Sequence, residues 1–200
     1  MSINSPRPSE RPLRIMLVLG SVRPGRVALP IALWVHDHLG DVPDIDVDFV
    51  DLMEEQLPFM DEPVLDGGQG YANAHSRAWS ERVARADAVI FVAPAYGDGF
   101  SPVVRNALDY LNREWHGKRV GLVTYGRDAK RLSRRLGDSL QARGMSVTRP
   151  VVAITDLQAR VRGFDFDGDS QISRSCVRMI GGVRQSFAAV EPQLVAGGVA

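Results

Sequence analysis

Residues 13–26 of this chain read LRIMLVLGSVRPGR, an almost continuous apolar run that ends in a glycine-containing turn. The run at residues 13–19 is typical of a strand that is buried on both faces of a parallel sheet. Apolar residues then recur at helical spacing over residues 27–39, and Gly40 indicates where that helix stops. The stretch therefore predicts a strand, a tight turn and a helix in immediate succession.

The same alternation continues along the chain. Ile45 begins a second strand, in which Asp46 and Asp48 alternate with apolar residues, as expected near a sheet edge. Ser101 and Pro102 suit the N-cap and first position of a later helix. The further predicted strands are 88–93, 119–125 and 147–154, and the further predicted helices are 72–86, 101–111, 129–142 and one within 170–190. This order favours a single α/β domain with a doubly wound, five-stranded parallel sheet and helices on both faces.

Composition restricts the class of protein. The 200 residues carry a formal net charge of zero, which argues against nucleic acid or an anionic membrane as the main partner. A single cysteine, Cys176, excludes an intramolecular disulfide and any site with several cysteine ligands. No apolar run reaches the roughly 18 residues of a membrane span, and the cytoplasm is the expected compartment. We expect a flexible arm at 1–12, the domain at 13–190 and a frayed tail at 191–200.

Doubly wound sheets bind ligands beyond the carboxyl ends of their strands, where three loops of this chain converge. The first, residues 20–26, offers a helix N-terminus, a serine hydroxyl and two arginines, which suit a phosphate, although it also reads as an ordinary turn with solvated arginines. The second, residues 94–102, has a rigid backbone and two aromatic residues. These residues either lie beside a bound flat ring or pack into the core. The third, residues 124–128, is weak by itself. Residues 52–71 are irregular, either a functional loop or a surface excursion.

Other polar residues do not indicate a metal site. His36 and His38 lie two apart in a predicted helix, and therefore on different faces. His75 suits a surface or capping role. The acidic residues of 165–169 lack the glycine and glutamate spacing of a calcium loop and predict a polar turn. Cys176 has no evident base partner and is expected to be inert.

Several of these stretches resemble one family. Residues 20–23 are similar to the G-S-x-R phosphate loop of the NADPH-dependent FMN reductases. Residues 86–96 (ADAVIFVAPAY) resemble that family's third strand and its P-E-Y-N loop, and residues 105–110 (RNALDY) its K-N-A-L-D-[WY] helix. Residues 57–63 (LPFMDEP) fit its loop after the second strand. The resemblance runs in unbroken order over residues 13–154.

The resemblance implies a flavodoxin-like fold with FMN at the carboxyl ends of the strands. The FMN phosphate would lie on Ser21, Arg23, Arg26 and the amides near Val27. The ring would lie against two further groups of residues, Pro94, Ala95, Tyr96, Gly97, and Tyr125, Gly126, Arg127. The implied function is an FMN-dependent oxidoreductase that takes hydride from NAD(P)H and reduces a flavin, a quinone or another small acceptor. In this family the flavin carries the chemistry, so no catalytic acid or base is expected. A homodimer is also implied.

The chain departs from the family pattern in two loops. Ala95 and Gly97 stand where P-E-Y-N has its carboxylate and amide side chains. Arg127 stands where the family continues with small residues, and either occupies space over the flavin or binds the 2′-phosphate of NADPH. The basic run at Lys130, Arg131, Arg134 and Arg135 either serves NADPH phosphates or is a solvated helix face. The altered loops leave two alternatives, a flavin-binding or flavin-free relative with an interaction role, and an FMN enzyme that acts on a specialised metabolite.

Overall fold

The computed structural model describes residues 11–63, 70–97 and 99–188. Its strands are β1 (Leu13–Leu19), β2 (Ile45–Asp51), β3 (Ala88–Tyr96), β4 (Gly99–Phe100), β5 (Arg119–Tyr125), β6 (Ser146–Val147), β7 (Val152–Ile154), β8 (Val161–Arg162) and β9 (Asp165–Phe166). Its helices are α1 (Ala28–Gly40), α2 (Leu52–Glu55), α3 (Ala74–Arg85), α4 (Pro102–Asp109), the 3-10 turn Arg113–Trp115, α5 (Ala129–Gln141), α6 (Leu157–Arg160) and α7 (Ser170–Ala188).

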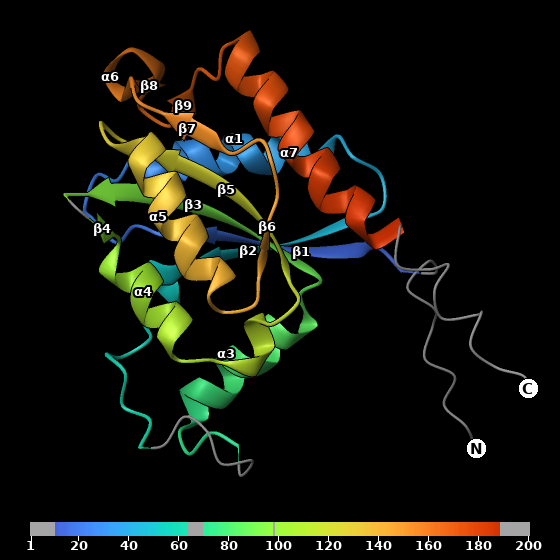
Figure 1. Cartoon of the computed structure of the whole chain (residues 1–200). Coiled ribbons are helices and arrows are strands. Elements are labelled where there is room, and N and C mark those ends of the chain that lie inside the picture. The colour runs from blue at the N-terminus through green and yellow to red at the C-terminus, as the bar shows by residue number, and fades with distance from the viewer. Residues whose placement is uncertain (1–10, 64–69, 98, 189–200) are drawn as a thin grey trace, which may run out of the picture.

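One sheet forms the centre of the molecule, with the strand order β2-β1-β3-β5-β6 (Figure 1). β1 pairs in parallel with both β2 and β3, so the strand order reverses next to β1. β5 continues the parallel sheet beside β3. This is the doubly wound order of the flavodoxin-like fold, and it places the ligand crevice beyond the ends of β1 and β3. The predicted fold class is confirmed.

The two faces of the sheet are covered by different helices, as the alternation of side chains along a strand requires. In β1, Met16 and Val18 face one core cluster with α3, α4 and α5. Ile15, Leu17 and Leu19 face the other, with α1 and α7. Figure 1 shows this division, with α1 and α7 above the sheet in this view and α3 and α4 below it. Apolar side chains on both faces of β1 explain why its sequence is almost continuously hydrophobic.

The fifth strand differs from the prediction. The expected strand at 147–154 is two short strands, β6 and β7, which both pair in parallel with β5. Pro150 lies between them and has no N–H group to donate to a neighbouring strand, so the ladder is interrupted there.

Smaller differences occur at other element ends. β3 is three residues longer than predicted and turns back into β4, with which it pairs antiparallel.

The ribbon of β8 and β9 was not predicted. It precedes α7, where Asp169 accepts hydrogen bonds of 2.9 Å from the amides of Gln171 and Ile172. The polar turn expected at 165–169 is therefore wrong for its first two residues, which form β9, and the stretch ends in a helix cap at Asp169.

Most of the predicted arm and all of the predicted tail, residues 1–10 and 191–200, lie outside the described residues. Within the described part, Arg11 donates to both carboxylate oxygens of Asp87, at 2.6 and 2.7 Å. Asp87 also accepts the amide of Arg14 at 2.8 Å. The chain is therefore attached to the domain from Arg11 onward.

Candidate functional site

The first loop leaves β1 at a point with no room for a side chain. A Cβ added to Gly20 would lie 2.4 Å from Cγ2 of Val104 and 3.2 Å from the carbonyl oxygen of Val92. The Gly20 amide donates to the same Val92 carbonyl at 2.9 Å. Among the described residues, no backbone hydrogen bond uses the amides of Val22 and Arg23. These amides can therefore bind an anion ahead of α1.

A buried serine connects the first loop with the third. Ser21 is 1% exposed, and its side chain lies beside that of Tyr125, the last residue of β5. Burial of Tyr125 raises the pKa of its phenol well above the ordinary value, so the group stays protonated at physiological pH. Tyr125 therefore presents a neutral hydroxyl group at the carboxyl edge of the sheet, beside Ser21.

The two arginines of the first loop have different surroundings. Arg26 donates from Nη1 to Asp51 Oδ1 at 2.6 Å and to the Ser21 carbonyl at 2.7 Å, and its Nη2 contacts the second Asp51 oxygen. Arg23 instead has its guanidinium over the ring of Tyr96, 5.5 Å from the centroid. The charge of Arg26 is therefore balanced by β2, whereas Arg23 faces an aromatic ring of the second loop.

The second and third loops touch through their backbones. Ala95 pairs with Phe100 in the turn from β3 to β4. Gly126 has a φ of +109°, a conformation that L side chains rarely adopt. An added Cβ there would contact the Cβ of Ala95 at 3.4 Å, and the Gly126 amide donates to the Ile154 carbonyl at 2.9 Å. Glycine thus allows the third loop to lie directly against the second.

The structure brings most of the sequence-predicted site residues to one edge of the sheet. Pro94 is opposite Tyr125 in the β3–β5 register, and Val27 is the N-cap of α1. Arg127 is exposed on the turn before α5, and Gly97 follows β3 with a φ of +44°. Arg26 is the exception, because its guanidinium is turned toward Asp51 rather than left available.

The residues at this edge have the chemistry of a nucleotide site. Backbone N–H groups, a serine hydroxyl and a guanidinium at a helix N-terminus suit a phosphate. The closely packed backbones of the second and third loops can donate and accept hydrogen bonds at the edge of a flat ring. The chemistry of the residues present therefore fits a flavin mononucleotide.

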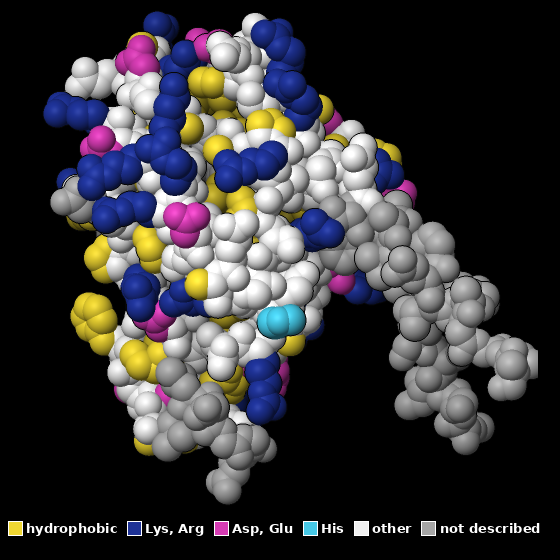
Figure 2. All heavy atoms as spheres, in the orientation of Figure 1, with side chains coloured by type: hydrophobic (Ala, Val, Ile, Leu, Met, Phe, Trp, Pro, Cys, Tyr) yellow, Lys and Arg dark blue, Asp and Glu magenta, His cyan; other side chains and the backbone are white. Residues whose placement is uncertain are grey.

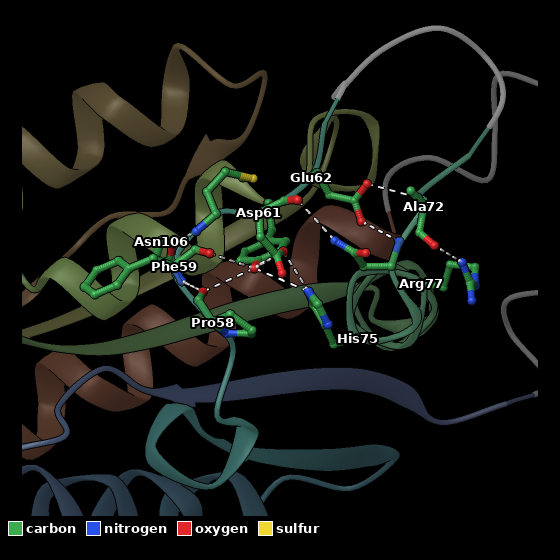
Figure 3. Close-up of polar contacts among 11 residues, drawn as sticks. Pro58, Phe59, Asp61, Glu62, Ala72, His75, Arg77 and Asn106 are labelled. Atoms are coloured by element: carbon green, nitrogen blue, oxygen red, sulfur yellow. Dashed lines mark hydrogen bonds and ion pairs between the residues drawn. The ribbon is translucent and has the colours of Figure 1, made fainter.

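A second group of residues, not predicted from the sequence, holds the loop at 57–63 against α3 and α4 (Figure 3). The amide of Met60 donates to Asn106 Oδ1 at 3.0 Å, and Asn106 Nδ2 donates to the Pro58 carbonyl at 2.6 Å. Asp61 Oδ1 lies 2.9 Å from both Nε2 of His75 and the hydroxyl of Tyr110. Hydrogen bonds from His75 and then Tyr110 lower the pKa of Asp61, so the carboxylate stays ionised.

This loop anchor, Pro58, Met60, Asp61, His75, Asn106 and Tyr110, joins residues up to 52 positions apart. The predicted surface role of His75 is refined, since it contacts Asp61 rather than its own helix end. The family resemblance did single out residues 57–63 and 105–110, and that was the available signal. Which side chains meet could not be read from it.

A shallow surface depression lies between the ends of β3 and β4 and the first half of α5. Its lining residues are Ala95, Gly97, Gly99, Asp128, Arg131, Leu132 and Arg135. Lys and Arg side chains gather over this part of the surface in Figure 2, around α5 and next to β4. The depression includes Ala95 and Gly97 of the predicted ring-binding loop, but it is too small to hold a ligand.

Three further sequence expectations concern groups elsewhere. Among residues 11–63, 70–97 and 99–188, no cluster of three His, Cys, Asp or Glu is placed to hold a metal ion. Cys176 is buried, and burial raises the pKa of its thiol to about 12, which makes it a poor nucleophile. No helix in the described part of the chain is long and apolar enough to cross a bilayer.

Comparison with known sequences points to one family. A family model described as NADPH-dependent FMN reductase matches residues 13–158. An NAD(P)H-dependent FMN reductase of Schizosaccharomyces pombe is 38% identical over 115 residues, which are 56% of this chain and 58% of the relative. Another, from Nectria sp., is 36% identical over 135 residues, covering 64% of this chain and 67% of the relative. The matched part thus spans little more than half of the first relative's length.

Comparison with solved structures gives the same fold. The flavoenzyme FerB of Paracoccus denitrificans, an NAD(P)H:(acceptor) oxidoreductase, superimposes with a TM-score of 0.66. The alignment covers 86% of this chain and 97% of FerB at 17% sequence identity. At that identity the similarity establishes the shared architecture alone.

Proposed function

Because the chain belongs to the NADPH-dependent FMN reductase family, we propose that it is an FMN-dependent oxidoreductase that uses NAD(P)H. The observation that carries the proposal is the convergence of three loops at the carboxyl edge of β1, β3 and β5, through the Ser21–Tyr125 and Arg23–Tyr96 contacts. The net reaction converts NAD(P)H, a proton and an oxidised acceptor into NAD(P)⁺ and the reduced acceptor.

The first loop is the proposed phosphate site. The amides of Val22 and Arg23, the Ser21 hydroxyl and the Arg23 guanidinium are the donors, and Val27 at the N-cap of α1 adds the positive end of the helix dipole. Arg26 is not assigned to the phosphate. It donates hydrogen bonds to both the Ser21 carbonyl and Asp51, and so it holds the loop in place. In this proposal Arg26 orders the backbone that the phosphate binds.

The second and third loops are the proposed ring site. FMN, when bound, supplies the chemistry of accepting a hydride and passing electrons on. Residues Pro94–Gly97 and Tyr125–Arg127 orient the ring through their backbone groups and pack against it. Ala95 and Gly97 place no carboxylate or amide side chain there, so ring recognition depends on the main chain.

The proposed acceptor is a small molecule, such as a flavin or a quinone. FerB is described as an NAD(P)H:(acceptor) oxidoreductase, and its likeness to this chain supports the class without identifying a compound.

We also propose a homodimer. Phe59 is 85% exposed, and its ring extends away from the polar contacts around Asp61 in Figure 3. In this proposal Phe59 packs against a second subunit, which would remove its ring from water.

The test is the visible absorption spectrum of the purified protein, recorded without oxygen as FMN and then NADPH are added. We expect a bound-flavin spectrum, retained through gel filtration, that bleaches on addition of NADPH. A protein that binds FMN but does not bleach with NADPH or NADH would contradict the oxidoreductase proposal. A protein that takes up no FMN would contradict the cofactor assignment and favour a flavin-free interaction role.

A further inference from the structure

A cavity lies at the end of α5 that is remote from the proposed flavin site. Its volume is about 680 Å³, which is within the range of sites for small molecules. One wall is formed by Asn112, Arg113 and His116, at the 3-10 turn, and the other by residues 141–144, which follow the last turns of α5. Because α5 has 13 residues, it separates this cavity from the third loop by about 20 Å.

Both walls are held in place by backbone and core contacts. Trp115 is fully buried, and its indole N–H donates to a backbone carbonyl of α4 at 3.1 Å, which leaves Arg113 and His116 exposed. Gly144 has a φ of +76°, and a Cβ added there would lie 2.4 Å from Cδ2 of the His116 ring. The Gly144 carbonyl also accepts the amide of Gly117 at 2.9 Å. The imidazole thus lies directly on the backbone of the opposite wall.

The positive charge of Arg113 is not balanced by a neighbouring carboxylate. None of the residues that line the cavity is acidic. Among residues 11–63, 70–97 and 99–188, no salt bridge includes Arg113. The adjacent Glu114 is directed elsewhere, since the Tyr71 hydroxyl lies 3.0 and 2.9 Å from its two carboxylate oxygens and Ser80 donates to one of them at 2.6 Å. Arg113 is therefore available to a ligand.

Arg143, on the second wall, has a structural explanation. It donates from Nη1 to the Ser139 carbonyl at 3.0 Å, and its Nη2 contacts Asp109. Asp109 also pairs with Arg105, so that one carboxylate is shared by two guanidinium groups. The other carbonyls of the last turn accept amides of residues 142–145, which satisfies the negative end of the helix. The helix end thus accounts for Arg143, but not for the exposed cation and imidazole of the first wall.

We propose that this cavity binds a small molecule through an oxyanion, either a phosphate or a carboxylate group, held by Arg113 and His116. A guanidinium group has forked donors that match either oxyanion, and an imidazole ring has an N–H donor in either tautomer. The amide side chains of Asn112 and Gln141 line the same cavity and can bind polar groups in the rest of the molecule. The inference does not rest on the proposed function, because the two sites lie at opposite ends of α5.

The experiment follows the backbone amide NMR spectrum of the isotope-labelled full-length protein, after FMN is added, as inorganic phosphate or citrate is titrated. Ionic strength is kept constant so that screening does not change. We expect saturable shifts for residues 112–117 and 141–145. Arg113→Gln should weaken this binding about 10-fold or more, the effect of losing a charge-assisted hydrogen bond. Arg134→Gln removes the same charge from an exposed position of α5 outside the cavity, and should change it by no more than about twofold.

The two probes distinguish the sources of the oxyanion. Shifts with phosphate alone support a phosphate-bearing ligand, shifts with citrate alone support a polycarboxylate, and shifts with both support a site for either oxyanion. The inference is overturned if neither probe shifts these residues, if Arg113→Gln and His116→Gln both leave the affinity unchanged, or if Arg134→Gln weakens it as much. Residues 20–27 report separately on the proposed FMN phosphate site, so a failure at the cavity leaves the proposed function intact.

Discussion

Arg23 and Arg26 are three positions apart in the same loop, yet the structure gives them different tasks. Arg26 is paired with Asp51, and Arg23 rests on an aromatic ring from which an incoming phosphate can draw it. Arg23→Ala is therefore expected to weaken FMN binding by about 10-fold to 100-fold, the effect of one charge-assisted hydrogen bond. The measurement is FMN fluorescence quenching on titration of the apoprotein.

The control for Arg23 is Arg174→Ala, which removes an exposed arginine from α7 on another part of the surface. It should leave FMN affinity unchanged. Full flavin retention by Arg23→Ala would remove Arg23 from the proposed phosphate site.

Gly20 is the second residue whose role is decided by its immediate contacts. In Gly20→Ala the new methyl group would meet Val104 Cγ2 at 2.4 Å, and such overpacking costs about 1–3 kcal/mol of unfolding free energy. Combining it with Val104→Ala removes that contact, so the double variant should be more stable than the sum of the two single effects. Urea denaturation of the four proteins measures this coupling.

Gly40→Ala is the matched control for Gly20, because an added Cβ there meets nothing within 4 Å. It lies in α1 and should be neutral or stabilising by up to about 1 kcal/mol. Additive effects of Gly20→Ala and Val104→Ala would show that the close contact does not limit this turn.

At the scale of elements, the loop at 57–63 is positioned by α4 as much as by its own sequence. Asn106→Ala removes the acceptor of the Met60 amide and the donor to the Pro58 carbonyl. We expect hydrogen exchange at Met60 to become about 5-fold faster or more, as the loss of a net hydrogen bond of about 1 kcal/mol allows local opening. Exchange mass spectrometry of the peptide covering 57–62 measures the change.

Asn112→Ala is suited as the comparison, since Asn112 is exposed and its side chain caps no helix. Unchanged exchange of the loop in Asn106→Ala would mean that Asp61, with His75 and Tyr110, is sufficient to hold it.

For the whole molecule, the proposed dimer can be tested through its exposed aromatics. Phe59→Asp should convert the dimer into a monomer, because a buried charge at an interface without a partner is strongly unfavourable. Sedimentation equilibrium gives the mass of each species. Phe164 is 77% exposed on the turn between β8 and β9, and Phe164→Asp should remain dimeric. A monomeric wild-type protein, or dissociation by both variants, would contradict a dimer formed through Phe59.

Much of the architecture followed from the sequence alone because it depends on local patterns. The near-continuous apolar run of β1 predicted a central parallel strand, and the alternating Asp46 and Asp48 predicted an edge strand, which β2 is. Ends of elements were less predictable, since they depend on neighbours. β3 continues to Tyr96 because β4 and β5 offer partners for its last residues.

The sequence by itself determined the succession of the main strands and helices along the chain and the apolar face of each element. It also determined which loops meet at the carboxyl edge of the sheet. These features are encoded by spacing along the chain and by the handedness of parallel crossovers. Only the tertiary structure decided that Arg26 pairs with Asp51 and that Asp61 meets His75 and Tyr110. The physical reason is that such contacts join residues distant in sequence, and which side chains meet depends on how helices pack on the sheet.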